Sequence, residues 1–178
     1  MIQPLLLPES FDALPGDARL WLLALDRTPD TAARTRLSGG LAGILGQWRH
    51  KGQAYQGAGA LLEPQLIAVA EPTLAHQPSG CAIDGMLRKV QRLLAELGLA
   101  TLDPATAIIA RSGDRLGAIP KAQIPERLAD GTLDAGTFLL DLSLYCLADL
   151  RAGRLEAPLA ETWVGRKYGV RRSPVAIG

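Results

Sequence analysis

Aromatic residues, cysteine and net charge are all scarce in this 178-residue chain. Aromatics make up 4% of the residues, the formal net charge is +1, and the only cysteines are Cys81 and Cys146. Two cysteines are too few for a disulfide framework or for a zinc site built from cysteine alone. We therefore predict two reduced thiols and a cytoplasmic location.

Long hydrophobic runs are also missing. No stretch approaches the roughly 18 uncharged apolar residues that a transmembrane helix needs, and the N-terminus lacks the basic and apolar regions of a signal peptide. We therefore expect no membrane partner. Hydrophobic residues at 48% and charged residues at 21% are instead typical of a globular protein. The abundance of Arg, Ala, Leu and Gly suggests a bacterium with a GC-rich genome.

The end of the chain is the one region where charge is uneven. From Trp163 onward it carries Arg166, Lys167, Arg171 and Arg172 and no acidic residue. A short basic segment can contact phosphate groups, but such a segment is more often a solvated chain end. We therefore do not expect nucleic acid as a partner.

Hydrophobic periodicity predicts an α+β fold with alternating strands and helices. The expected strands cover residues 19–26, 57–63, 66–71, 107–110 and 116–119, and the expected helices cover 31–49 and 83–97. The order strand, helix, strand, strand, helix, strand is that of a ferredoxin-like βαββαβ core. We expect a two-layer sandwich of this kind, with both helices on one face of an antiparallel sheet and a C-terminal α/β extension. The expected boundaries are an irregular arm at 1–18, a single α+β domain at 19–168 and a basic tail at 169–178.

The first candidate site is the segment from Ser79 to Asp84, where Ser-Gly leads Cys81 into the start of a helix. Free backbone N–H groups and the helix dipole favour a thiolate there. Gly80 would leave room for a ligand, and Asp84 would cap the backbone or orient a donor. The alternative is that Cys81 is a small apolar core residue and that Ser79 or Asp84 is only a cap.

The second candidate site is Trp48-Arg49-His50 near the end of the first predicted helix. His50 can act as a base, and Trp48 offers a large apolar face with one donor. The alternative is that Trp48 belongs to the core and that His50 and Lys51 form a C-terminal cap completed by Gly52. Phosphate-binding loops, dinucleotide fingerprints and zinc-protease motifs are absent, so we predict no cofactor and no metal.

Together these motifs resemble those of an uncharacterised bacterial family of similar length. Its members carry W-x-x-H, an apolar hairpin, and then S-G-C-x-I-D at a helix start; this chain has the shorter Trp48-Arg49-His50. The resemblance covers residues 19–98 and extends to Trp163, where the family tends to have a tryptophan. It implies one site formed by Trp48, His50, Ser79, Gly80, Cys81 and Asp84. Some members carry the label of an ABC transporter ATPase, but this chain lacks the phosphate-binding loop that an ATPase requires.

Three functions fit these observations. The first is a thiol-dependent enzyme for acyl or sulfur transfer, with Cys81 as nucleophile, His50 as activating base and Asp84 as orienting group. The second is a non-catalytic module that binds a small molecule or anion, with Ser79 and Gly80 at the ligand and Trp48 or Trp163 as a stacking wall. The third is a homodimeric interaction protein that pairs through a sheet face or edge.

Overall fold

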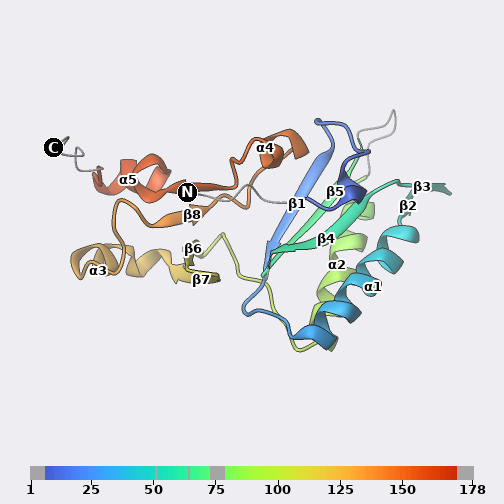
Figure 1. Cartoon of the computed structure of the whole chain (residues 1–178), viewed down its shortest axis with the longest axis horizontal. Coiled ribbons are helices and arrows are strands. Elements are labelled where there is room, and N and C mark those ends of the chain that lie inside the picture. The colour runs from blue at the N-terminus through green and yellow to red at the C-terminus, as the bar shows by residue number, and fades with distance from the viewer. Residues whose placement is uncertain (1–6, 51, 64, 73–78, 172–178) are drawn as a thin grey trace.

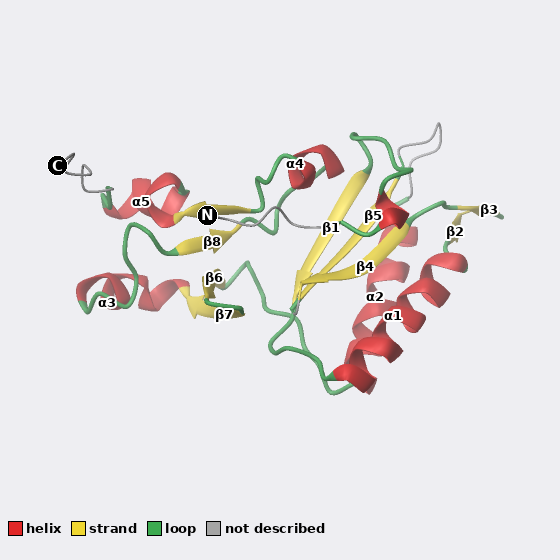
Figure 2. Ribbon diagram, in the orientation of Figure 1, coloured by secondary structure: helices red, strands yellow, loops and turns green. Residues whose placement is uncertain are grey.

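The structure is a computed structural model that describes residues 7–50, 52–63, 65–72 and 79–171. The molecule is elongated, and its two larger sheets lie one in each half (Figure 1). Helices and antiparallel strands occur in both halves (Figure 2), which confirms the predicted α+β class.

The first sheet contains β1 (Arg19–Ala24), β4 (Ala58–Glu63) and β5 (Leu66–Glu71). Their order is β1-β5-β4, and each neighbouring pair is antiparallel. All six residues of the central strand β5 are buried. Such a strand is covered on both faces, which explains why its sequence is an apolar run without alternation.

Two long helices cover one face of this sheet, α1 (Thr31–Gly46) and α2 (Gly80–Glu96). Asp30 caps α1 by accepting a hydrogen bond from the Ala33 N–H at 2.8 Å. Gly98, with φ of +65°, follows α2 in the left-handed conformation expected after a helix end. The helices pack against each other on the same face, as predicted. Their bounds differ, since α1 ends before Trp48 and α2 begins three residues before Ile83.

The second sheet has the order β7-β6-β8-β9. Its strands are β6 (Ala107–Ser112), β7 (Arg115–Pro120), β8 (Phe138–Leu140) and β9 (Glu156–Pro158). The strand that follows α2 therefore pairs in a different sheet from β1. For this reason the strand order does not show the expected ferredoxin-like core.

Short helices pack around the two sheets. They are η1 (Glu9–Phe11), η2 (Lys121–Gln123), α3 (Ile124–Ala129), α4 (Leu147–Arg151), η3 (Leu159–Glu161) and α5 (Trp163–Tyr168). A two-residue ladder of β2 (Arg49–His50) and β3 (Gln53–Ala54) follows α1. Within the described part of the chain, none of the helices is long and apolar enough to cross a membrane.

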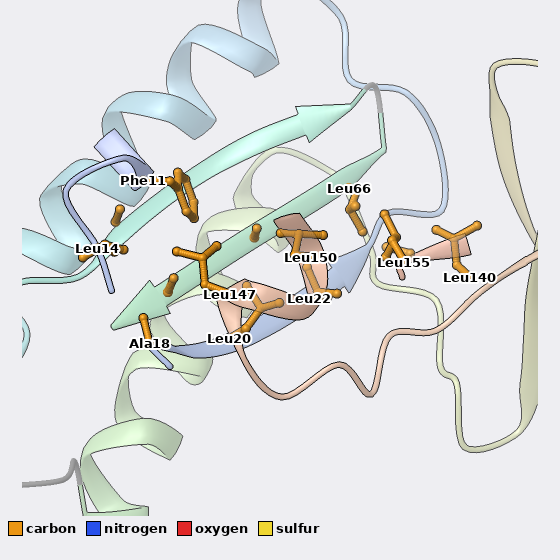
Figure 3. Packing of buried hydrophobic residues seen from close by; sticks show 14 of the residues in the cluster. Phe11, Leu14, Ala18, Leu20, Leu22, Leu66, Leu140, Leu147, Leu150 and Leu155 are labelled. Carbon is orange, nitrogen blue, oxygen red and sulfur yellow. The ribbon is translucent and has the colours of Figure 1, made fainter. Parts of the chain in front are cut away.

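Three apolar clusters hold the molecule together. One lies between the first sheet and helices α1 and α2, and another lies among the second sheet, α3 and α5. The third covers the opposite face of the first sheet with Phe11, Leu147 and Leu150, and extends through Leu140 and Leu155 toward the second sheet (Figure 3). The segment predicted as an irregular arm therefore contributes a fully buried residue, Phe11, to the core.

A buried glutamine joins the two sheets. The Gln65 side chain donates from Nε2 to the carbonyl oxygens of Leu25 at 3.0 Å and Leu116 at 3.2 Å. Its Oε1 accepts from the Leu116 N–H at 2.9 Å. The amide thus bonds to both backbone groups of a β7 residue, in the manner of a neighbouring strand.

Candidate functional site

Cys81 lies in the first turn of α2 and is exposed. Ser79 caps this helix, because its Oγ accepts a hydrogen bond from the Ala82 N–H at 3.3 Å. Cys81 lines a groove of about 190 Å³ together with Trp48, Arg49 and Lys89. The thiol is therefore accessible, has two cationic side chains in the same groove and is not enclosed by aliphatic side chains.

Trp48 connects the two candidate motifs. Its indole Nε1 donates to the carbonyl oxygen of Ala82 at 3.0 Å, so the end of α1 is tied to the start of α2. The side chain is only 4% exposed. Its ring makes an edge contact with Trp21, with centroids 5.7 Å apart, and lies 4.9 Å from the ring of Tyr55. Trp48 is thus a core residue beside the Cys81 groove, and it offers little surface for stacking.

The other residues of the proposed triad are not brought to Cys81 by a described contact. The His50 side chain lies outside the described part of the chain, so its pairing with Cys81 remains a prediction. Asp84 is exposed, and its carbonyl oxygen accepts a hydrogen bond from Arg88 Nε at 3.3 Å. Because Ser79 caps α2, Asp84 is one turn into the helix and is not its cap.

A buried acidic residue at the end of β5 was missed by the sequence analysis. Glu71 is 0% exposed, and neither of its carboxylate oxygens has a hydrogen-bond partner among the described residues. Burial raises the pKa of Glu71, while the positive charge of Arg19 opposes that shift. The Tyr55 hydroxyl is also buried. Burial, followed by the negative charge of Glu71, raises the pKa of this phenol, while a hydrogen bond with the Ser79 backbone opposes that shift. A single charged residue at the end of the apolar run 66–71 was the available sequence signal.

A cavity of about 420 Å³ lies in the other half of the molecule beside Trp163. Strands β6 and β8 are paired at a single position, Ala110–Leu139. Residues 107–109 and 139–143 line the cavity next to this short pairing. Trp163, at the start of α5, is 43% exposed and forms part of the wall. Of the predicted ligand-binding residues, Trp163 is therefore the one with an available aromatic face, and it belongs to a different site from Cys81.

Cationic side chains surround this tryptophan. Lys121 Nζ lies 5.8 Å from the Trp163 ring centroid and Lys167 Nζ lies 5.9 Å from it. Lys121, Arg154 and Arg166 line the cavity, and the acidic side chains of Asp141 and Glu161 line it as well. The cavity therefore combines an aromatic wall with an excess of positive charge.

Metal binding finds no support in the described residues, where no group of three or more His, Cys, Asp or Glu side chains could hold an ion. Comparisons of the chain with protein-family models, with curated proteins and with solved structures found no match. The two sites must therefore be interpreted from their own geometry.

Proposed function

We propose that this protein binds a small molecule in the cavity beside Trp163, and that the ligand has a planar ring and an anionic group. The exposed Trp163 face, with cations on the wall of the same cavity, is the observation that carries this proposal. A volume of about 420 Å³ lies within the range of small-molecule sites. Stacking on Trp163 would hold the ring, and Lys121 and Arg166 would meet the anionic group.

The hydrogen bonds of the cations support an anionic ligand. Lys121 Nζ donates to the Ala105 carbonyl oxygen at 2.8 Å, and Arg166 Nη1 donates to the Glu161 carbonyl oxygen at 3.3 Å. These carbonyl groups orient the side chains without neutralising their charge, and the Lys121 charge also contributes to lowering the pKa of the Asp103 carboxyl. Arg154, in contrast, forms an ion pair with Asp149 at 2.6 Å. We therefore expect Lys121 and Arg166 to contact the anionic group of the ligand. Hydrogen bonds between charged groups are stronger than those between neutral groups.

A calorimetric titration tests this proposal with adenosine 5′-monophosphate as the probe and with adenosine and inorganic phosphate as partial ligands. We expect the complete probe to bind more tightly than either part. Trp163→Leu removes a stacking contact worth about 1–3 kcal/mol, so it should weaken binding by roughly fivefold or more. Lys121→Gln removes a charged hydrogen bond of about 1.5–3 kcal/mol, so it should weaken binding by roughly tenfold or more. Lys89→Gln, in the Cys81 groove, is the matched control. No binding, or equal binding by all variants, would refute the proposal.

A thiol reaction at Cys81 is the second candidate, because the exposed thiol shares a groove with Arg49 and Lys89. In this proposal Cys81 is the nucleophile for acyl or sulfur transfer in a cytoplasmic protein, His50 activates it, and Ser79 and Gly80 leave room for the substrate. The proposed relationship to the bacterial family rests on Trp48, His50 and the Ser79-Gly80-Cys81 motif, and it therefore concerns this groove. Alkylation of Cys81 against pH, in the parent and in His50→Ala, tests the assignment. Equal rates at every pH would show that His50 has no part in it.

A further inference from the structure

The cavity beside Trp163 lies where strands β6 and β8 separate. From the pair Ala110–Leu139, a complete antiparallel ladder would continue to the pair Ala107–Leu142. The two strands form no pair there, and both Ala107 and Leu142 lie on the cavity wall. The cavity therefore takes the place of the missing part of a β ladder.

On β6, a turn uses the donor that β8 would need. The Lys121 N–H donates to the Thr106 carbonyl oxygen at 3.0 Å, so the backbone of Thr106 faces β7 and that of Ala107 faces β8. The Ala107 N–H donates instead to the Asp103 carbonyl oxygen at 3.1 Å. The Ala107 carbonyl oxygen is left without a hydrogen-bond partner among the described residues.

On β8, a second turn ends the strand opposite this position. The Asp141 N–H donates to the Leu155 carbonyl oxygen at 2.7 Å, so the backbone of Asp141 faces β9 and that of Leu142 faces β6. Asp141 Oδ1 accepts a hydrogen bond from the Ser143 N–H at 2.9 Å, which turns the chain. The Leu142 N–H has no hydrogen-bond partner in the part of the chain that the structure describes. It therefore faces the Ala107 carbonyl oxygen across the cavity.

These two backbone groups give the cavity one acceptor and one donor besides its cations. Ala107 is only 7% exposed, and backbone groups next to a core are normally paired. In small-molecule sites, a few backbone groups of this kind fix the orientation of the ligand. A ligand that fills the gap needs a donor for Ala107 and an acceptor for Leu142.

We propose that the ring of the ligand is a nitrogen heterocycle whose edge carries both a hydrogen-bond donor and an acceptor, as in the base of a nucleotide. This inference rests on the proposed function, because the same ring stacks on Trp163. The donor of the ring bonds to the Ala107 carbonyl oxygen, and its acceptor receives the Leu142 N–H. An aromatic acid without a polar ring edge would leave both backbone groups unpaired, which is costly in a closed site.

Calorimetric titrations with three nucleoside 5′-monophosphates test this inference. Adenosine and inosine monophosphate carry both a donor and an acceptor on the base, whereas purine riboside monophosphate lacks the donor. We expect the tighter of the first two to bind at least about fivefold more tightly than the third. Equal binding by all three would overturn the inference, but the proposed function would stand if Trp163→Leu weakened all of them. If none of the three binds, the proposed function fails and the inference fails with it.

Amide hydrogen exchange locates the contact. The Leu142 N–H should exchange rapidly in the free protein and at least about fivefold more slowly at a saturating concentration of the tightest monophosphate, because it gains an acceptor. The matched control is the N–H of Ser143, which is already bonded to Asp141 and should change little. Strong protection of Leu142 in the free protein would overturn the inference, because its N–H would already be paired. Equal slowing of Leu142 and Ser143 would also overturn it, because the ligand would then have no specific contact with Leu142.

Discussion

The Gln65 side chain joins the two larger sheets through buried hydrogen bonds, and its replacement tests how much the fold depends on them. The Gln65→Met variant keeps the length of the side chain but removes its amide. The Leu116 N–H and C=O would lose their described partner, and the Leu25 carbonyl would lose one donor. Gln65 is 1% exposed and Leu116 is 5% exposed, so water cannot replace these bonds without a local rearrangement.

The expected cost follows from the number of groups left without a partner. A buried backbone group that loses its hydrogen bond costs about 1–3 kcal/mol. With two such groups on Leu116 and a third partly affected on Leu25, Gln65→Met should lower the free energy of unfolding by about 2–5 kcal/mol. This is large against a total stability of roughly 5–15 kcal/mol.

Urea denaturation followed by circular dichroism measures this change. The matched control is Gln53→Met, at an exposed position of β3, which should change stability by less than about 0.5 kcal/mol. A loss below about 1 kcal/mol for Gln65→Met would show that the two sheets do not depend on this amide, and the reasoning would be wrong.

Three further predictions concern stability and reactivity. Glu71→Gln should raise the free energy of unfolding at pH 7 by about 1 kcal/mol and have little effect near pH 4. Burial raises the pKa of Glu71 in the folded protein, so the stability of the parent falls as the pH rises through and above the ordinary carboxyl range. Parallel curves of stability against pH for the parent and the variant would contradict this. Gly43→Ala should stabilise α1 by up to about 1 kcal/mol, because an added Cβ meets nothing within 4 Å. Gly165→Ala should destabilise the protein, because its Cβ would lie 2.5 Å from a backbone carbonyl oxygen. Thermal melts that rank the two variants in the opposite order would refute the packing argument. Cys81 should be alkylated faster than Cys146, which is half-buried and donates to Asp149 at 3.3 Å; mass spectrometry of each cysteine over time gives the two rates, and equal rates would contradict the difference in access.

Local sequence signals were sufficient for the first half of the fold. The apolar stripe of α2, its cap at Ser79 and its terminal Gly98 all lie within one segment, as do the two apolar strands β4 and β5. In the second sheet, the expected strands at 107–110 and 116–119 are observed as the paired strands β6 and β7, but the rest of this sheet was not predictable in the same way. Strands β8 and β9 have three residues each, which is too short to establish a periodic pattern, and their partners are distant in the sequence.

The candidate sites differ in the same way, since a local motif can be predicted from the sequence and a contact between distant segments cannot. The Trp48–Ala82 hydrogen bond joins the end of α1 to the start of α2, and a single site that includes His50, Cys81 and Asp84 stays a prediction. The cavity beside Trp163 was not foreseen, because Lys121 and Arg154 reach it from separate segments and neither is part of a local motif. Only the tertiary fold brings these charges to one tryptophan.

The indole N–H signals of an NMR titration test the central claim most directly, since Trp163 and Trp48 lie at different sites. On addition of adenosine 5′-monophosphate, the account predicts a saturable shift of the Trp163 signal. The Trp48 signal should stay unchanged, because that indole is buried and bonded to Ala82. A Trp163 signal that does not move at saturating probe, or a response confined to Trp48, would contradict the assignment of the binding site.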